Sequence, residues 1–164
     1  FIAASFVFMG LTACKNIDKY DVTFNDRPVY SPQRLFTDYR VSAKALANCI
    51  EQAIDDFEIY TADGLELLNC SDAGISSLLG LSQFANLRRL KLSNNEIRNL
   101  VELSVMTELI EVQLDGNNVI DSVPLTSLPR VERINLADNP ALQCEGVAKF
   151  SSAIQITLPE HCQS

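Results

Sequence analysis

The stretch LRRLKLSNNEIRNL, residues 87–100, decides the fold. Its apolar residues stand at positions 87, 90, 92, 97 and 100, and Asn95 lies among them. An amphipathic helix would need apolar residues at steps of three and four throughout, and a half-buried strand would need strict alternation beyond Asn95. Neither period covers the whole stretch, so it predicts a short strand followed by a tight turn.

The same spacing recurs along the chain at a step of 22 residues. Seven columns keep this step: Leu65, Leu87, Leu109 and Val131; Leu68, Leu90, Val112 and Ile134; Cys70, Leu92, Leu114 and Leu136; Ile75, Ile97 and Val119; Leu81, Leu103, Leu125 and Val147; Phe84, Met106, Leu128 and Phe150; Asn95, Asn117 and Asn139. The repeat copies are residues 65–86, 87–108, 109–130 and 131–152. A half copy follows, with Ile156 and Leu158 in the first strand positions. A repeat of this length indicates a solenoid.

The pattern Leu-x-x-Leu-x-Leu-x-x-Asn-x-Ile resembles the leucine-rich-repeat family, in the 22-residue form of internalin-like bacterial proteins. The resemblance covers residues 65–158 and implies an α/β fold, a right-handed solenoid. Each copy would give one strand to a parallel sheet on the concave side and a short 3₁₀ or extended segment to the convex side. Because one copy cannot bury its apolar face alone, the stack forms a continuous core whose ends need caps.

The asparagine column is expected where the chain turns sharply inward. An amide at that point can bond backbone groups that the turn removes from the strand ladder. The first copy departs from this pattern, because it has Ala73 in the asparagine position and Gly74 after it. Its turn must therefore be stabilised in another way.

The beginning of the chain predicts where the solenoid is located. Residues 1–13, FIAASFVFMGLTA, are uncharged and form an apolar run shorter than the roughly 20 residues of a spanning helix. They look like the apolar part of a signal peptide. The chain begins at Phe1 without a methionine or a basic segment, so we expect the start of that peptide to be missing.

Leu11-Thr12-Ala13-Cys14 resembles the lipobox of bacterial lipoproteins, in which the cysteine is acylated and becomes the first mature residue. The alternative is a signal peptide followed by a coincidental free cysteine. Several acyl chains on Cys14 would give a stable membrane anchor. In two-membraned bacteria an aspartate after this cysteine holds such proteins at the inner membrane. Lys15 stands there instead, which implies the outer membrane and leaves its periplasmic and surface faces open.

Export to an oxidising compartment makes the other four cysteines informative, since they admit three disulfide pairings. In the implied solenoid, Cys70 lies in the first copy, whereas Cys144 and Cys162 lie three or four strand spacings of ~4.8 Å away. A disulfide needs Cα atoms within about 7 Å. We therefore expect Cys49 to pair with Cys70 and Cys144 with Cys162. A zinc site is the rival, but the close cysteine pairs of such sites are missing.

Residues 41–64 are expected to form an N-terminal cap with its entry to the repeats, and residues 153–164 a C-terminal cap. Ser42 is a plausible N-cap of a helix over about residues 42–57. Its apolar face would be Leu46, Ile50, Ala53, Ile54 and Phe57, covering the open edge of the first copy. Residues 14–40 are interpreted as a lipid tether, with a small hairpin around Asn25-Asp26 that Pro28 and Pro32 limit.

Composition and motifs exclude several function classes. The 164 residues are 47% hydrophobic, enough for one solenoid domain, and a net charge of -8 argues against nucleic-acid binding. No nucleophile elbow, His-Glu-x-x-His helix or phosphate loop is present, so we expect neither an enzyme nor a cofactor. The only histidine, His161, is interpreted as a surface residue, and Asp55-Asp56 as a solvated helix face. Asp115-Gly116-Asn117-Asn118 lacks the downstream glutamate of a calcium loop.

The strand positions that face away from the core are the expected binding surface, because ligands of this family usually meet the concave sheet. They are Leu67, Asn69 and Ser71; Arg89, Lys91 and Ser93; Glu111, Gln113 and Asp115; Arg133, Asn135 and Ala137. They contain no aromatic residue, so a protein or peptide partner is preferred to a carbohydrate. Arg89, Glu111 and Arg133 should stand side by side, either pairing laterally or leaving a positive patch for an acidic partner segment.

These observations together predict a monomeric, lipid-anchored envelope protein whose solenoid is a protein- or peptide-binding module. One alternative is a structural envelope component that packs into a larger assembly by its convex side or edge. Another is an accessory or inhibitor of an envelope enzyme.

Overall fold

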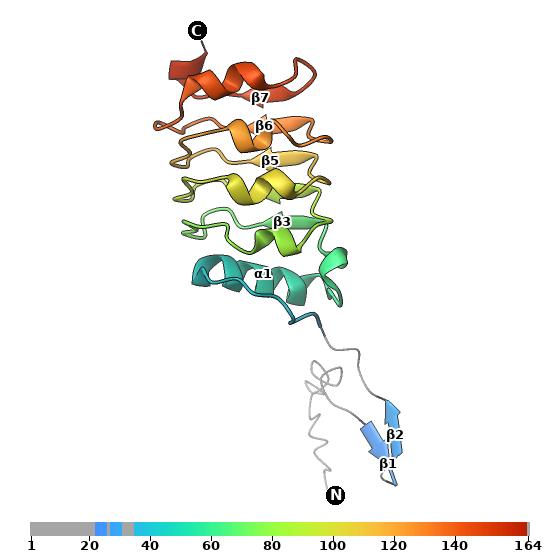
Figure 1. Cartoon of the computed structure of the whole chain (residues 1–164). Coiled ribbons are helices and arrows are strands. Elements are labelled where there is room, and N and C mark those ends of the chain that lie inside the picture. The colour runs from blue at the N-terminus through green and yellow to red at the C-terminus, as the bar shows by residue number, and fades with distance from the viewer. Residues whose placement is uncertain (1–21, 26, 31–34, 164) are drawn as a thin grey trace, which may run out of the picture. The chain divides into compact units, whose positions relative to one another are not determined.

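The computed structural model of the chain describes residues 22–25, 27–30 and 35–163, and the described residues form two units divided at residue 34 (Figure 1). The first unit contains the antiparallel strands β1 (Val22–Phe24) and β2 (Arg27–Tyr30). Asn25 has a left-handed backbone (φ 49°), a conformation that asparagine tolerates in a tight turn. Two strands thus lie where the hairpin is expected; Asp26 and Pro32 lie outside the described residues.

The second unit begins with a cap around helix α1 (Lys44–Asp56), which buries Leu46, Ile50, Ala53 and Ile54. The assignment of Ser42 as the N-cap is wrong. Ala43 holds that position, with an extended backbone and no side-chain cap, and its carbonyl accepts the first helical bond from the amide of Ala47 at 2.9 Å. Phe57, expected on the apolar face, lies after the helix and is 58% exposed.

Leu35 to Arg40 belong to this second unit, although the tether was expected to continue through residue 40. The ring centroids of Phe36 and Tyr39 lie 6.2 Å and 5.6 Å from that of buried Phe84. The backbone amide of Phe36 donates to the carbonyl of Ile59 at 2.8 Å. These contacts order the segment because they bury aromatic area against the first repeat.

Five short strands form one parallel sheet in chain order, as expected for the solenoid (Figure 1). They are β3 (Leu67–Asn69), β4 (Arg89–Lys91), β5 (Glu111–Gln113), β6 (Arg133–Asn135) and β7 (Gln155–Thr157). The 3₁₀ segments of the convex side are η3 (Leu81–Gln83), η4 (Val101–Val105), η5 (Val123–Leu125) and η6 (Cys144–Lys149); η2 (Ala62–Gly64) and η7 (Glu160–Cys162) lie near the two ends of the sheet. Each strand residue pairs with the residue 22 positions further along the chain, in the next strand. The length of the sequence repeat therefore sets the register of the sheet.

The repeated apolar columns form the core between the sheet and the 3₁₀ segments. Leu68, Leu90 and Val112 are fully buried in the strand column, and Leu81, Leu103 and Leu125 are fully buried in the 3₁₀ column. Burial of one such side chain stabilises the fold by about 1.5–3 kcal/mol. The core is therefore assembled from equivalent layers, each of which needs its neighbours.

The buried asparagines hold the turns of two copies at once. The amide nitrogen of Asn117 donates to the carbonyls of Leu92 (2.8 Å) and Leu114 (3.0 Å), and its oxygen accepts from the amide of Ile97 (3.0 Å). Equivalent bonds from Asn95 reach the first copy, where its oxygen accepts from the amide of Ile75 at 2.9 Å. The turn of the first copy, which lacks its own asparagine, is thus stabilised by that of the second.

Two disulfides close the ends of the repeat array. Cys49 of α1 joins Cys70 with Cα atoms 5.8 Å apart, and Cys144 joins Cys162 with Cα atoms 5.3 Å apart. These are the two pairs expected from the sequence. Among the described residues, no helix is both long and apolar enough to cross a membrane.

Candidate functional site on the concave sheet

The structure places the expected partner-binding residues in two rows across the outward side of the sheet, here called the concave surface. The first row is Leu67, Arg89, Glu111, Arg133 and Gln155, and the second is Asn69, Lys91, Gln113, Asn135 and Thr157. The residue between the two rows in each of strands β3 to β6 is buried. The rows follow directly from the parallel register, because equal positions in successive copies become lateral neighbours.

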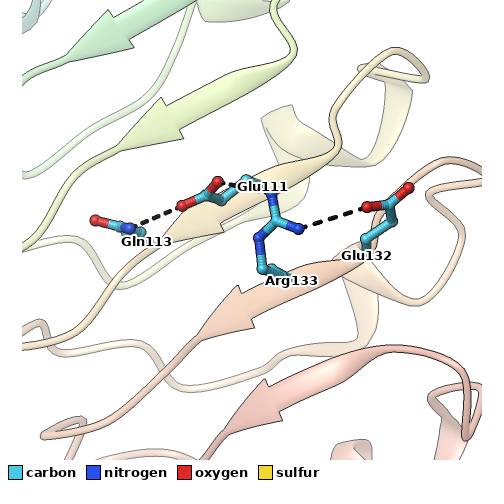
Figure 2. A network of polar contacts seen from close by, with 4 residues as sticks. All are labelled: Glu111, Gln113, Glu132 and Arg133. Atoms are coloured by element: carbon cyan, nitrogen blue, oxygen red, sulfur yellow. Dashed lines mark hydrogen bonds and ion pairs between the residues drawn. The ribbon is translucent and has the colours of Figure 1, made fainter.

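Glu111 is the centre of a polar network on this surface (Figure 2). One carboxylate oxygen accepts from Nη2 of Arg133 at 3.0 Å, and the other accepts from Nε2 of Gln113 at 2.9 Å. A second nitrogen of Arg133 lies 3.5 Å from a carboxylate oxygen of Glu132. Both carboxylate oxygens of Glu111 are therefore engaged within its own strand or with β6.

The surroundings of Glu111 keep it ionised. The hydrogen bond from Arg133 is the largest influence on its pKa and lowers it. Partial burial acts in the opposite direction, but the bond from Gln113 and the charges of Arg133 and Lys91 leave the pKa of Glu111 below its ordinary value. Glu111 is thus a fixed negative charge that compensates Arg133 and not Arg89.

Three other cationic side chains at this end of the sheet are not held in ion pairs. Within the described part of the chain, Arg88, Arg89 and Lys91 form no ion pair. Arg88, Arg89 and Arg133 line a hollow of 240 Å³ together with Glu66, Leu67 and Ile110, here called the arginine hollow. Arg133 is already paired with Glu111, so the two guanidinium groups of Arg88 and Arg89 stand against the one carboxylate of Glu66, and the hollow favours an anionic group.

Arg88 was missed by the sequence analysis, which considered only alternate strand positions. It occupies the position just before the strand, in register with Glu66, Ile110 and Glu132. The 22-residue repeat could have placed it there, but nothing in the alternation of the strand shows that this position also opens toward the concave side.

A further polar cluster surrounds Asp115, which lies two residues beyond Gln113 of the second row. One carboxylate oxygen of Asp115 accepts from the hydroxyl of Ser93 at 2.7 Å and from the side-chain amide of Asn135 at 3.0 Å. Asp115 thus connects three neighbouring copies. This role agrees with its interpretation as a repeat residue.

The remaining candidate residues lie at the ends of the chain. Cys14 is outside the described residues, so its lipidation remains a prediction. His161 is exposed, and its Nε2 lies 3.0 Å from the carbonyl oxygen of Leu142. It also lies beside Cys144 and Cys162, but their sulfurs are joined and offer no thiolate to a metal.

Comparison of the sequence with models of protein families and with curated proteins finds no match. Solved structures do match. Internalin C2 of Listeria monocytogenes gives a TM-score of 0.57 at 20% identity, over 70% of this chain and 53% of that one. Internalin F of Listeria monocytogenes gives 0.50 at 16% identity, over 71% of this chain and 43% of that one. The chain thus spans about half the length of these internalins, and at such identity the likeness shows the fold alone. In fold, therefore, this chain is an internalin-like leucine-rich-repeat solenoid.

Proposed function

We propose that this protein is lipid-anchored in the bacterial envelope and binds a segment of a protein partner on its concave surface. The lipobox-like residues 11–14 and the two disulfides support the anchor and the exported location. The solenoid fold supports a role in binding, because stacked repeats form extended concave surfaces. The outer membrane is the proposed membrane, since Lys15 follows Cys14.

The unpaired positive charge of the concave surface is the observation that carries the binding proposal. The chain as a whole has a net charge of -8. At β4, however, Arg88, Arg89 and Lys91 lie at the concave surface, and none of them forms an ion pair among the described residues. An acidic partner segment would dock there, and its charge would contribute specificity and association rate more than affinity. Five strands at ~4.8 Å spacing are roughly 20 Å across, which suits a peptide or a single loop.

Charge reversal on the concave surface tests this proposal. The variant Arg89→Glu with Arg133→Glu leaves every core position unchanged, so its thermal stability should fall only slightly; exposed ion pairs contribute about 0.2–1 kcal/mol each. Partner capture is measured by chemical crosslinking of the full-length protein in its own membranes, followed by purification. The proposal predicts that the double variant retains less than about a tenth of the wild-type crosslinked partner, which is a change of about 1.4 kcal/mol or more.

The matched control is Arg98→Glu with Lys149→Glu, which changes the net charge equally but lies outside both rows of the concave surface. It should capture the partner at the wild-type yield. If the Arg89→Glu, Arg133→Glu variant captured as much partner as the wild type, the concave-surface proposal would be wrong.

A structural role on the convex side is the second candidate, and one observation favours it. Leu79, Val101 and Val105 are 60%, 62% and 65% exposed, and Leu79 and Val101 occupy the same position of consecutive copies. Exposed aliphatic side chains gathered in this way can mark a packing surface. Under this alternative, Leu79→Ser with Val101→Ser would release the protein from a larger assembly on native gels, and the concave variant would not.

A further inference from the structure

A hollow lies between α1 and β3, at the capped end of the concave surface. Its volume is 560 Å³, and we call it the cap hollow. The helix contributes Asn48, Gln52 and Asp56, and Phe57 follows at the helix end. Opposite them, Leu67 and Asp72 belong to the first repeat. None of these residues except Leu67 was expected to bind a partner.

The walls of the cap hollow combine an aromatic ring with acidic and amide groups. Phe57 is 58% exposed, whereas Leu46, Ile50, Ala53 and Ile54 of the preceding helix are buried. Asp56 and Asp72 are exposed, and within the described residues neither carboxylate takes part in an ion pair or a side-chain hydrogen bond. No lysine, arginine or histidine is among the residues that line the hollow.

This combination matches the guanidinium group of an arginine. A guanidinium stacks on aromatic faces and donates paired hydrogen bonds to carboxylates. The amide oxygens of Asn48 and Gln52 can accept from its remaining N–H groups. An aliphatic ligand would leave the two carboxylates unpaired, and an acidic ligand would be repelled by them.

The cap hollow also adjoins a hollow of the opposite charge. Leu67 lines both the cap hollow and the arginine hollow, so the two are contiguous on the sheet. Arg88 and Arg89 line the second hollow, whereas Asp56 and Asp72 line the first. A partner segment lying across β3 and β4 would therefore contact the negative charges of the cap hollow at one end and the positive charges of the arginine hollow at the other.

We propose that the cap hollow binds an arginine side chain of the partner segment whose neighbouring acidic side chain occupies the arginine hollow. This inference rests on the proposed function and specifies the partner: a segment in which a basic and an acidic residue are close together. The opposite charges of the two hollows fix the direction in which the segment crosses the sheet, because the reversed segment would place like charges together.

The cap hollow is held in shape before any partner arrives. The disulfide between Cys49 and Cys70 joins its two walls, with Cα atoms 5.8 Å apart, and both cysteines lie in its lining. Binding into such a hollow does not require α1 to be ordered first, which reduces the entropy cost of association.

A pair of small probes tests the cap hollow directly: N-acetylarginine amide, and N-acetylcitrulline amide as its uncharged analogue. Each is titrated into the full-length ¹⁵N-labelled protein, and the side-chain amide signals of Asn48 and Gln52 are followed by NMR. The arginine probe should shift these signals saturably, and the citrulline probe should bind at least about tenfold more weakly, because it cannot form charge-assisted bonds.

Conservative variants identify the groups responsible. Asp56→Asn with Asp72→Asn keeps side-chain size and should reduce arginine binding to the level of citrulline. Phe57→Leu should weaken it about threefold through loss of the aromatic face. The matched control, Asp55→Asn with Asp63→Asn, changes two exposed acids outside the lining and should leave arginine binding unchanged.

No shift with the arginine probe, or equal shifts with both probes, would overturn the arginine site. Such a failure is separate from that of the proposed function, because the probes contain no partner. The concave-surface proposal is decided by the crosslinking yield of the Arg89→Glu, Arg133→Glu variant, independently of whether the arginine probe binds.

Discussion

At the scale of single residues, the buried asparagines do the most to define the repeat. Asn95, Asn117 and Asn139 are at most 6% exposed, and each side chain bonds backbone groups of its own copy and of the preceding copy. A buried amide that satisfies several backbone groups rigidifies a turn, because removing it leaves each of those groups unpaired.

Asn117→Ala should therefore lower the free energy of unfolding by about 3 kcal/mol or more, since a buried group left unpaired costs about 1–3 kcal/mol. Denaturant unfolding with an unchanged m-value measures it. Asn118→Ala is the control, because the neighbouring Asn118 is exposed, and its effect should stay within about 0.5 kcal/mol. Similar losses in the two variants would contradict this role of the asparagine column.

Glu102 of η4 performs a related function on the convex side. One of its carboxylate oxygens accepts from the amide of Gly80 at 2.9 Å and from the hydroxyl of Ser82 at 2.7 Å, at the start of η3. Burial raises the pKa of Glu102, but the hydrogen bonds from Ser82 and Gly80 outweigh it and hold the pKa below its ordinary value of 4.5. The ionised form is thus the one that the fold prefers.

This depressed pKa predicts the sign of a pH effect. The stabilisation from Glu102 is fully present above pH 4.5 and is lost as the pH falls through the lower pKa of the folded state. The stability advantage of the wild type over Glu102→Gln should shrink as the pH falls from about 6 to about 3. Ser82→Ala should weaken this pH dependence by removing the shortest bond. A pH-independent difference between wild type and Glu102→Gln would refute the assignment.

The sequence predicts the asparagine column but not all of the hydrogen bonds that its side chains form. The column is visible because Asn95, Asn117 and Asn139 recur every 22 residues. The support that Asn95 gives to the turn at Ala73 is not visible, since it depends on how far neighbouring copies overlap in space. The sequence also misplaces the helix start: serine favours N-caps in general, but Ala43 holds that position, one residue after Ser42, without a side-chain cap.

At the scale of elements, the strands and the cap helix follow from apolar spacing alone. Helix α1 was expected because Leu46, Ile50, Ala53 and Ile54 lie on one face, and all four are buried. The segment from Leu35 to Arg40 is interpreted from the sequence as part of a tether between the anchor and the cap. Its order comes from contacts of Phe36 and Tyr39 with Phe84, more than forty residues away, which a local pattern cannot reveal.

The disulfide of the N-terminal cap gives a prediction at this scale. The variant Cys49→Ala with Cys70→Ala opens a loop with a sequence separation of 21 and should lose about 3 kcal/mol of stability. Hydrogen exchange should accelerate more in α1 and β3 than in β5, because the bond joins α1 to Cys70, the residue directly after β3. Peptide mapping without reduction should find Cys49 with Cys70 and Cys144 with Cys162. A peptide joining Cys70 to Cys162 would contradict the stacking order.

At the scale of the whole molecule, the sequence predicts the architecture but not the partner. A 22-residue period repeated in seven columns restricts the fold, because every core layer must match the next. The outward side chains are not restricted in this way, since Arg89 and Glu111 occupy the same structural position with opposite charges. Function therefore depends on surface positions that the period leaves open.

The proposed anchor is tested on the mature protein. We expect a chain that begins at Cys14, carries added acyl mass on that residue and partitions with membranes, because several acyl chains bind stably. Cys14→Ala should abolish the added mass and release the protein from membranes. Intact-mass measurement decides this prediction, and a mature N-terminus beyond Cys14 would end the lipoprotein proposal.

The most direct test of the central claim compares the two sides of the solenoid by site-specific photo-crosslinking in the protein's own membranes. A photoreactive amino acid replaces Gln113, in the middle strand of the concave surface, or Leu79, which is 60% exposed on the convex side. The concave proposal predicts a partner adduct from position 113 and none from position 79, and loss of that adduct when Arg89→Glu and Arg133→Glu are added. An adduct from position 79 without one from position 113 would contradict it.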